Sequence, residues 1–206
     1  MKKLLAIILA ALMLVPMLAA CDRSGTQKGD YKVAMITDYG DITDQSFNQT
    51  TYEACKAFAE DNSIEFSYFK PAGDNTADRV AMIEKAVDEG YNVIVMPGYA
   101  FGGAIVEAAP EFPDVKFIAV DVTQGDIGTD AIPANCYCIT FKEEQAGYLA
   151  GYAIVKDGKT KLGFLGGMAV PAVIRYGYGY VQGADAAAQE LGTNIDINYF
   201  YGGQFY

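Results

Sequence analysis

The segment YKVAMITDYGDITDQSFNQ, residues 31–49, holds the pattern that decides the fold. A short apolar run at 31–37 stops at a polar turn, and helical spacing begins at Ser46. The run does not alternate between apolar and polar residues, which is typical of a strand buried on both faces of a parallel sheet. It therefore predicts the first strand and the first helix of an α/β fold.

The same order of strand and helix continues along the chain. Further strands are expected at 64–69, 92–96, 115–120 and 137–141, and helices at 46–61, 76–90, 103–111 and 143–155. Strands separated by helices form right-handed crossovers in a doubly wound sheet. Residues 31–156 are thus predicted to form an N-terminal α/β lobe.

A second lobe is expected to begin after the charged, turn-rich joint KDGKTK at 156–161. Strands at 162–165 and 195–201 enclose a helix at 173–191. Because the pattern stops on a strand with no helix to cover it, residues 157–206 are predicted to be the start of a truncated C-terminal lobe. Two such lobes suggest a cleft between them.

The N-terminus predicts export. Residues 1–20 have a positive start, an apolar run and small residues before Cys21, as in a signal peptide. The ending Leu-Ala-Ala-Cys resembles a bacterial lipobox, so Cys21 is predicted to carry a lipid, and the polar residues 22–30 are predicted to be a flexible tether. The alternative is an uncleaved membrane anchor, but its 17 apolar residues are at the short limit for spanning a bilayer.

Composition excludes several classes of function. Without the two lysines of the signal peptide, 13 basic residues face 26 acidic ones, a net charge of −13. This argues against nucleic-acid binding and disfavours polyanionic ligands, whereas a neutral or cationic small ligand is compatible with it. The chain has no histidine, which removes the commonest general base and metal ligand. No metal or cofactor is predicted, and the spacing of Asp38, Asp41 and Asp44 does not fit a calcium loop.

The cysteines after Cys21 are predicted to be buried apolar residues. Cys55 lies in a helical pattern, and Cys136 and Cys138 point to one face of a strand. A disulfide stays open as an alternative in an extracellular protein.

Ligands of open α/β sheets bind at the carboxyl ends of the strands, so the residues that follow each strand are the candidate site. They offer carboxylates for hydroxyl groups, an amide, and aromatic faces for stacking, a set that suits a nucleoside. Each of these residues also has a structural alternative: an aspartate can cap a helix or close a turn, and Phe47 can be core. The candidate ligand-binding residues are Asp38, Phe47, Asn48, Gly98, Tyr99, Asp121, Met168 and Phe205.

Several stretches resemble one family. TDYGDITDQSFNQ at 37–49 is similar to the signature of the basic membrane protein (BMP) family, which includes purine nucleoside receptor lipoproteins. FIAVD at 117–121, ITFKEEQAGYLAG at 139–151, LGFLGGMAVP at 162–171 and GYGYVQG at 177–183 match it in order. The resemblance implies a type I periplasmic-binding fold and a substrate-binding lipoprotein of an ABC importer.

The resemblance also implies roles for individual residues. Asp38 and Asn48 would bind the nucleoside, Phe47 and Phe205 would stack on its base, and Asp121 would be a further ligand-contacting acid. Ala169 stands where many members of the family have aspartate, which is a departure from a standard purine site. The family's later ligand positions lie beyond residue 206.

The main hypothesis is a nucleoside receptor, tethered to the outer face of the cell membrane, that closes around its ligand and delivers it to an ABC permease. A receptor of the same fold for a sugar or a signalling molecule is the second hypothesis. The third is an enzyme, such as a nucleoside hydrolase with Asp38 as base, which the absence of histidine disfavours.

Overall fold

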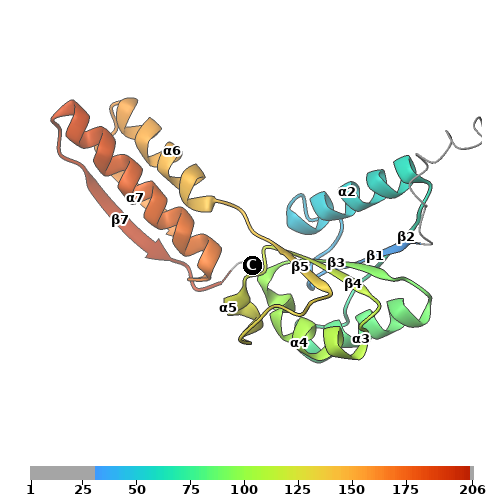
Figure 1. Cartoon of the computed structure of the whole chain (residues 1–206). Helices are drawn as coiled ribbons and strands as arrows, with labels where there is room; N and C mark the ends of the chain where they lie inside the picture. Colours follow the sequence, from blue (N-terminus) through green and yellow to red (C-terminus); the bar gives the residue numbers. More distant parts are fainter. Residues whose placement is uncertain (1–30, 205–206) are drawn as a thin grey trace, which may run out of the picture.

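The computed structural model describes residues 31–204, which form two α/β units side by side (Figure 1). Cys21, the signal peptide, the tether and Phe205 lie outside the described residues. The first unit holds β1 (Lys32–Ile36), α2 (Phe47–Asn62), β2 (Glu65–Phe69), α3 (Thr76–Asp88), β3 (Val93–Pro97), the 3₁₀ helix η1 (Tyr99–Phe101), α4 (Gly102–Glu111), β4 (Lys116–Val120), α5 (Gln124–Ile127) and β5 (Cys136–Ile139). The second holds α6 (Glu143–Lys156), β6 (Lys161–Gly166), α7 (Pro171–Leu191) and β7 (Asp196–Tyr201).

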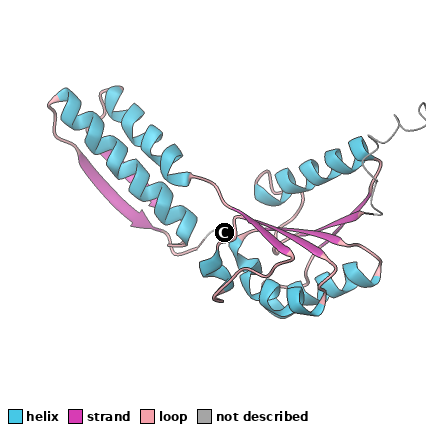
Figure 2. Ribbon diagram, viewed as in Figure 1, coloured by secondary structure: helices cyan, strands magenta, loops and turns pink. Residues whose placement is uncertain are grey.

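The first unit is built on a parallel sheet with strand order β2-β1-β3-β4-β5. Helix α2 lies on one face of this sheet, and α3 and α4 lie on the other (Figures 1 and 2). The order changes direction between β1 and β3, which is the switch point where doubly wound sheets bind ligands. The predicted α/β fold with parallel sheets is confirmed.

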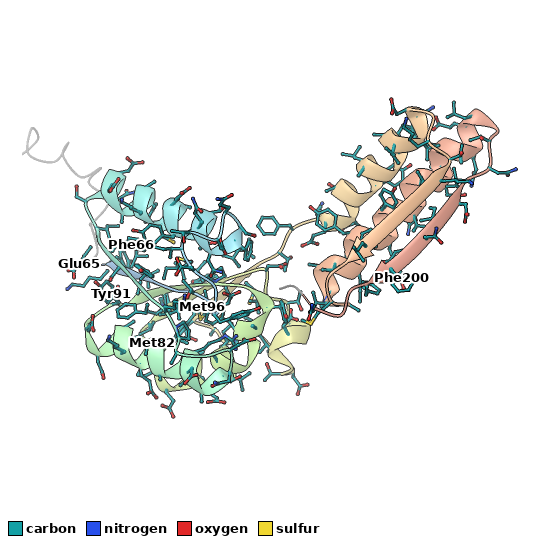
Figure 3. The ribbon with its side chains drawn as sticks, turned by 180° about the vertical axis from the view of Figure 1, so that it is seen from behind. Glu65, Phe66, Met82, Tyr91, Met96 and Phe200 are labelled. Atoms are coloured by element: carbon teal, nitrogen blue, oxygen red, sulfur yellow. The ribbon has the colours of Figure 1, made fainter. Side chains whose placement is uncertain are left out.

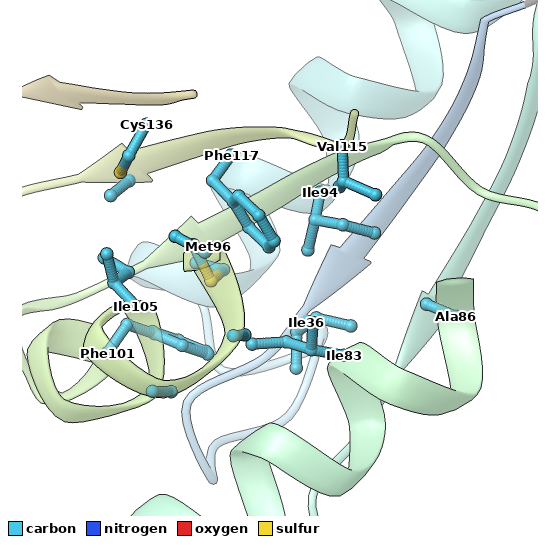
Figure 4. Packing of buried hydrophobic residues seen from close by; sticks show 14 of the residues in the cluster. Ile36, Ile83, Ala86, Ile94, Met96, Phe101, Ile105, Val115, Phe117 and Cys136 are labelled. Atoms are coloured by element: carbon cyan, nitrogen blue, oxygen red, sulfur yellow. The ribbon is translucent and has the colours of Figure 1, made fainter. Parts of the chain in front are cut away.

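The core lies between the sheet and the helices α3 and α4 (Figure 4). Ile94, Met96 and Phe117 point from the strands toward Ile83 on α3 and Ile105 on α4, and all five side chains are fully buried. Figure 3 shows Met82 and Met96 on this side of the sheet. Burial of apolar strands on both faces explains why their sequence does not alternate.

The second unit has a two-stranded parallel sheet, β6-β7, with α6 and α7 on one face (Figure 1). Its core is small and consists of Val155, Leu162, Ala184, Ala187 and Ala188. On the other face of the sheet, Leu165 and Phe200 are 77% and 71% exposed, and Figure 3 shows Phe200 projecting from β7.

Helices α6 and α7 pack with their backbones in contact. A Cβ atom built on Gly151 of α6 would lie 1.9 Å from the carbonyl oxygen of Tyr180 on α7. One built on Gly183 of α7 would lie 1.9 Å from the carbonyl oxygen of Tyr148 on α6. Only residues without a side chain allow helices to approach this closely. Glycine is an unfavourable residue inside a helix, but here Gly151 and Gly183 allow the two helices to pack in contact.

This packing moves the expected boundary between the lobes. The sequence placed it at residues 156/157, with the helix at 143–155 in the N-terminal lobe, but α6 shares its core with α7 and β6. The chain passes from one unit to the other between β5 and α6, at residues 140–142. The charged joint at 156–161 is instead the tight turn within the second unit that leads from α6 to β6.

Other differences are local. The sequence did not predict η1 or α5, which are too short to leave a periodic pattern. Cys136 and Cys138 point to the same side as expected, with their sulfur atoms 3.9 Å apart, and together with Cys55 they are free thiols. Within residues 31–204, no helix combines the length and the apolar character needed to cross a membrane.

Candidate ligand-binding site

The carboxyl ends of β1 and β3 open onto a pocket of about 430 Å³. This volume is in the range of small-molecule sites, roughly 300–1,000 Å³. Both units contribute to the pocket, since Met168 follows β6 and Gln204 follows β7. The residues that line it are Asp38, Tyr39, Ser46, Asp74, Gly98, Tyr99, Ala100, Met168 and Gln204.

The loop between β1 and α2 is held by a network around Asn48. The amide nitrogen Nδ2 of Asn48 donates to Asp38 Oδ1 at 2.9 Å and to Asp44 Oδ2 at 3.0 Å. The backbone N–H of Asp38 in turn donates to Asn48 Oδ1 at 3.3 Å. Asn48 is 1% exposed and does not line the pocket, so its contact with the pocket is indirect, through its hydrogen bond to Asp38.

Asp44 closes the loop at the start of α2. Its carboxylate accepts hydrogen bonds from the backbone N–H groups of Ser46, Asn48 and Gln49. Burial works to raise the pKa of Asp44, but the hydrogen bonds from Asn48 and the backbone lower it below its ordinary value. Asp44 therefore caps the start of α2, which is the structural alternative for an aspartate at this place.

Two glycines bring backbone close to the pocket. Gly98, at the end of β3, has a φ of 117°, a conformation that residues with a side chain rarely adopt. A Cβ atom on Gly40 would lie 2.5 Å from Asn48 Nδ2 and would break the network around Asp38. Any larger residue at either position would displace the loops that line the pocket.

Asp121 lies apart from the pocket, at the boundary between the units. It lines a separate small cavity with Tyr99 from the first unit and Arg175 from α7. Burial, and then the nearby negative charge of Glu143, raise the pKa of the Asp121 carboxyl to about 6. Its φ of 59° is also unusual for a residue other than glycine.

Glu143 and Arg175, which both act on the charge of Asp121, form an ion pair. Arg175 Nε donates to Glu143 Oε2 at 2.7 Å and so joins the start of α6 to α7. Although burial acts to raise the pKa of Glu143, the hydrogen bond from Arg175 lowers it. Glu143 therefore stays charged and repels a second charge on Asp121.

The structure brings together part of the predicted site. Asp38, Gly98, Tyr99 and Met168 line the pocket. Phe47, the first residue of α2, is half-buried but is not among the lining residues.

The candidate residues chosen from the sequence did not include five that line the pocket, which are Tyr39, Ser46, Asp74, Ala100 and Gln204. Asp74 lies in the connection between β2 and α3, after the strand next to β1. The rule that ligands bind where parallel strands end, applied to β2 as it was to β1 and β3, would have found it. Ala100 belongs to η1 and left no signal in the sequence.

A larger groove of about 600 Å³ lies on α6 and α7, lined by Tyr148, Leu149, Tyr178 and neighbouring residues. It is mostly apolar and is not at the carboxyl ends of the strands. The pocket at the strand ends combines several hydrogen-bonding groups with aromatic rings and is therefore the better candidate site.

Comparison with known proteins agrees with the geometry. A family model described as ABC transporter substrate-binding protein PnrA-like matches residues 31–206. The chain is 32% identical over 209 residues to the ABC transporter nucleoside-binding protein BmpA of Lactococcus lactis subsp. cremoris, a match that covers 96% of the chain and 57% of the relative. It is 31% identical over 207 residues to basic membrane protein A1 of Borrelia garinii subsp. bavariensis, covering 100% of the chain and 57% of that protein.

Solved structures give the same fold. An ABC transporter solute-binding protein from Aeropyrum pernix superposes with a TM-score of 0.70 at 25% identity, over 85% of this chain and 48% of that one. The myo-inositol binding protein of Caulobacter superposes with a TM-score of 0.59 at 14% identity, over 84% of this chain and 56% of that one, which shows the fold alone. The chain thus spans about half the length of the proteins it matches.

The resemblance of the sequence motifs to the BMP family and the expected type I periplasmic-binding fold are both confirmed by these matches. With a family model that covers residues 31–206 and relatives of more than 30% identity along nearly the whole chain, the protein belongs to the PnrA-like family of ABC transporter substrate-binding proteins.

Proposed function

We propose that this protein binds a nucleoside between its two units and delivers it to an ABC permease. One observation carries the proposal: the pocket at the ends of β1 and β3 is lined from both units and offers carboxylates together with aromatic rings. Carboxylates accept hydrogen bonds from the hydroxyl groups of a sugar, and aromatic faces suit a base. The relative from Lactococcus lactis, named as a nucleoside-binding protein, supports the same ligand class.

The charge of the pocket supports a nucleoside over a nucleotide. Asp38 and Asp74 both line it, and among its described lining residues there is no lysine or arginine. A phosphate group would meet the Asp38 carboxylate with no cation among these lining residues to compensate it, at a cost that rises as water is excluded. A neutral ligand avoids this repulsion.

Binding would proceed by closure of the units around the ligand. They are joined in sequence between β5 and α6, and Met168 and Gln204 come to the pocket from the second unit. Rotation at this connection would change the distance between Met168 and Asp38 and would enclose a bound molecule. No bond is made or broken in such a cycle, in keeping with a family of binding proteins.

The proposed place of action is the outer face of the cytoplasmic membrane. A lipid on Cys21, followed by the polar residues 22–30, would hold the folded units close to the permease. A relative from Pyrococcus abyssi, 27% identical, is named as a lipoprotein. Labelling with radioactive palmitate, compared between the native sequence and Cys21→Ser, tests this part of the proposal. Equal labelling of both would contradict it.

Isothermal titration calorimetry on the full-length protein tests the ligand class. Inosine, guanosine, adenosine and their 5′-monophosphates would be compared at the same ionic strength. At least one nucleoside is expected to bind more tightly than its monophosphate. Tighter binding of the monophosphates would refute the charge argument, and binding of neither would refute the proposed ligand class.

A receptor for another small neutral solute, such as a sugar or a signalling molecule, is the second candidate. It is favoured by one observation: Phe47, the aromatic residue expected to stack on a base, is not among the residues that line the pocket. Replacing Phe47 with alanine tests whether a base stacks on this ring. A nucleoside receptor that stacks its base on Phe47 should lose about 1–3 kcal/mol of binding free energy, whereas a sugar receptor should lose much less.

A further inference from the structure

Asp74 is placed at the pocket by a residue below it. Arg79, in the first turns of α3, has only 4% of its side chain exposed, and its Nη2 pairs with Asp74 Oδ1. The guanidinium carbon also lies 5.7 Å from the centre of the Phe101 ring. Asp74 itself is 56% exposed and lines the pocket. The carboxylate thus has one side fixed by a buried cation and the other side open to the cleft.

The buried cation makes this arrangement rigid. A charge out of contact with water is costly unless it is paired. Within the described part of the chain, Asp74 is the acidic partner of Arg79. Arg79 Nε has no hydrogen-bond partner there, so Asp74 is the acceptor that compensates the guanidinium. Movement of Asp74 away from the pocket would leave Arg79 buried and unpaired.

Asp38, which follows the neighbouring strand β1, is also held through one of its two carboxylate oxygens. Its Oδ1 accepts hydrogen bonds from the backbone N–H groups of Tyr39 and Gly40 and from Asn48 Nδ2. Among residues 31–204, no hydrogen bond is made to Oδ2 of either Asp38 or Asp74. Because β1 and β2 pair side by side, the two carboxylates follow adjacent strands and face one pocket.

We infer that Asp74 is a second ligand-contacting carboxylate, which accepts a hydrogen bond from a hydroxyl group of the ligand, and that Arg79 is its positioning residue. The inference rests on the proposed function and names a contact within the same pocket. Asp38 and Asp74 would each offer one oxygen to the ligand, so the pocket selects a molecule with two separate hydrogen-bond donors. Pairing with Arg79 neutralises Asp74, which lets a second carboxylate stand in the pocket without strong repulsion from Asp38.

The test measures the affinity of each protein variant for a nucleoside and for analogues that each lack one hydroxyl group. Calorimetry on the full-length protein would measure binding of the best-bound nucleoside and of its 2′-, 3′- and 5′-deoxy analogues. Asp74→Asn is expected to weaken binding of the parent nucleoside about tenfold or more, as expected for loss of a hydrogen bond to a charged group. For the one analogue that lacks the contacted hydroxyl, the same substitution should have almost no effect.

Two variants keep this test sharp. Asp88→Asn removes a carboxylate from the exposed end of the same helix and should leave every affinity unchanged. If Asp74→Asn fails to fold because Arg79 loses its charged partner, the double variant Asp74→Asn/Arg79→Met removes both charges together and should show the same dependence on the analogue.

The outcomes are distinct. An equal loss for the parent and for all three analogues, or no loss at all, would overturn the role of Asp74 while the proposed function stands. A native protein that binds none of the nucleosides would overturn the proposed function itself.

Discussion

Replacing Gly151 with alanine should destabilise the second unit, although alanine is the better helix former. The new Cβ atom would lie 1.9 Å from the carbonyl oxygen of Tyr180 and 2.9 Å from the backbone nitrogen of Ala184. Reaching even 3.0 Å from that oxygen requires the contact to open by about 1.1 Å. Both contacts are with backbone, so no change of side-chain rotamer can relieve them.

The magnitude follows from two opposed effects. Overpacking of this kind costs about 1–3 kcal/mol, and the upper end applies because whole helices must separate. The higher helix propensity of alanine offsets about 1 kcal/mol of this. The free energy of unfolding should therefore fall by about 2 kcal/mol, which corresponds to a decrease of about 4–8 °C in Tm for a protein of this size.

Urea unfolding followed by far-UV circular dichroism would measure the change. Gly163→Ala is the matched control, because its Cβ atom would lie 3.9 Å from the nearest atom, the carbonyl oxygen of Asn198. This variant should change stability by no more than about 0.5 kcal/mol. If Gly151→Ala were as stable as the wild type or more stable, α6 and α7 would not be in backbone contact.

Three further predictions concern the loop, the boundary between the units and the thiols. Asn48→Ala removes the hydrogen bonds to Asp38 and Asp44, so the free energy of unfolding in urea should fall by about 2 kcal/mol, and ligand affinity should also fall. If neither value changed, the network would not be what holds the loop. The pKa of Asp121 is about 6 in the folded state, above its ordinary value. The free energy of unfolding of the native protein should therefore rise relative to that of Asp121→Asn as the pH falls from 7 through 6, and a difference between the two proteins that does not vary with pH would contradict this. Burial of Cys136 raises the pKa of its thiol to about 12, and partial burial of Cys55 raises the pKa of its thiol to about 11. Iodoacetamide at neutral pH should therefore label both thiols in urea and neither in the native protein, and rapid labelling of the native protein would contradict this.

Much of the first unit was predictable because its strands and helices have strong local patterns. Each strand is a short apolar run followed by a turn, and the parallel order follows from the helices between the strands. The same reasoning located Asp38, Gly98 and Tyr99, since residues after parallel strands collect at one edge of a sheet.

The differences between the expected and the observed arrangement have physical causes. A charged run at 156–161 has the composition of a joint between domains, and nothing local shows that α6 packs on α7. That packing depends on Gly147 and Gly151 of α6 facing the backbone of α7, and on Gly179 and Gly183 of α7 facing the backbone of α6, a match between residues distant in sequence. Asp121 was grouped with the pocket because it follows β4, but the turn there directs it toward Arg175 and Glu143 instead.

The close packing of α6 and α7 also has a mechanical consequence. Two helices with their backbones in contact resist bending, so in the proposed closure they would move as one lever whose fulcrum lies at residues 140–142. The 21 residues of α7 give this lever a length of about 32 Å. Each degree of rotation at the fulcrum moves the far end, near Leu191, by about 0.5 Å, so a small displacement at the pocket becomes a movement of several ångströms at the tip. The proposed closure would therefore change the position of a surface far from the pocket.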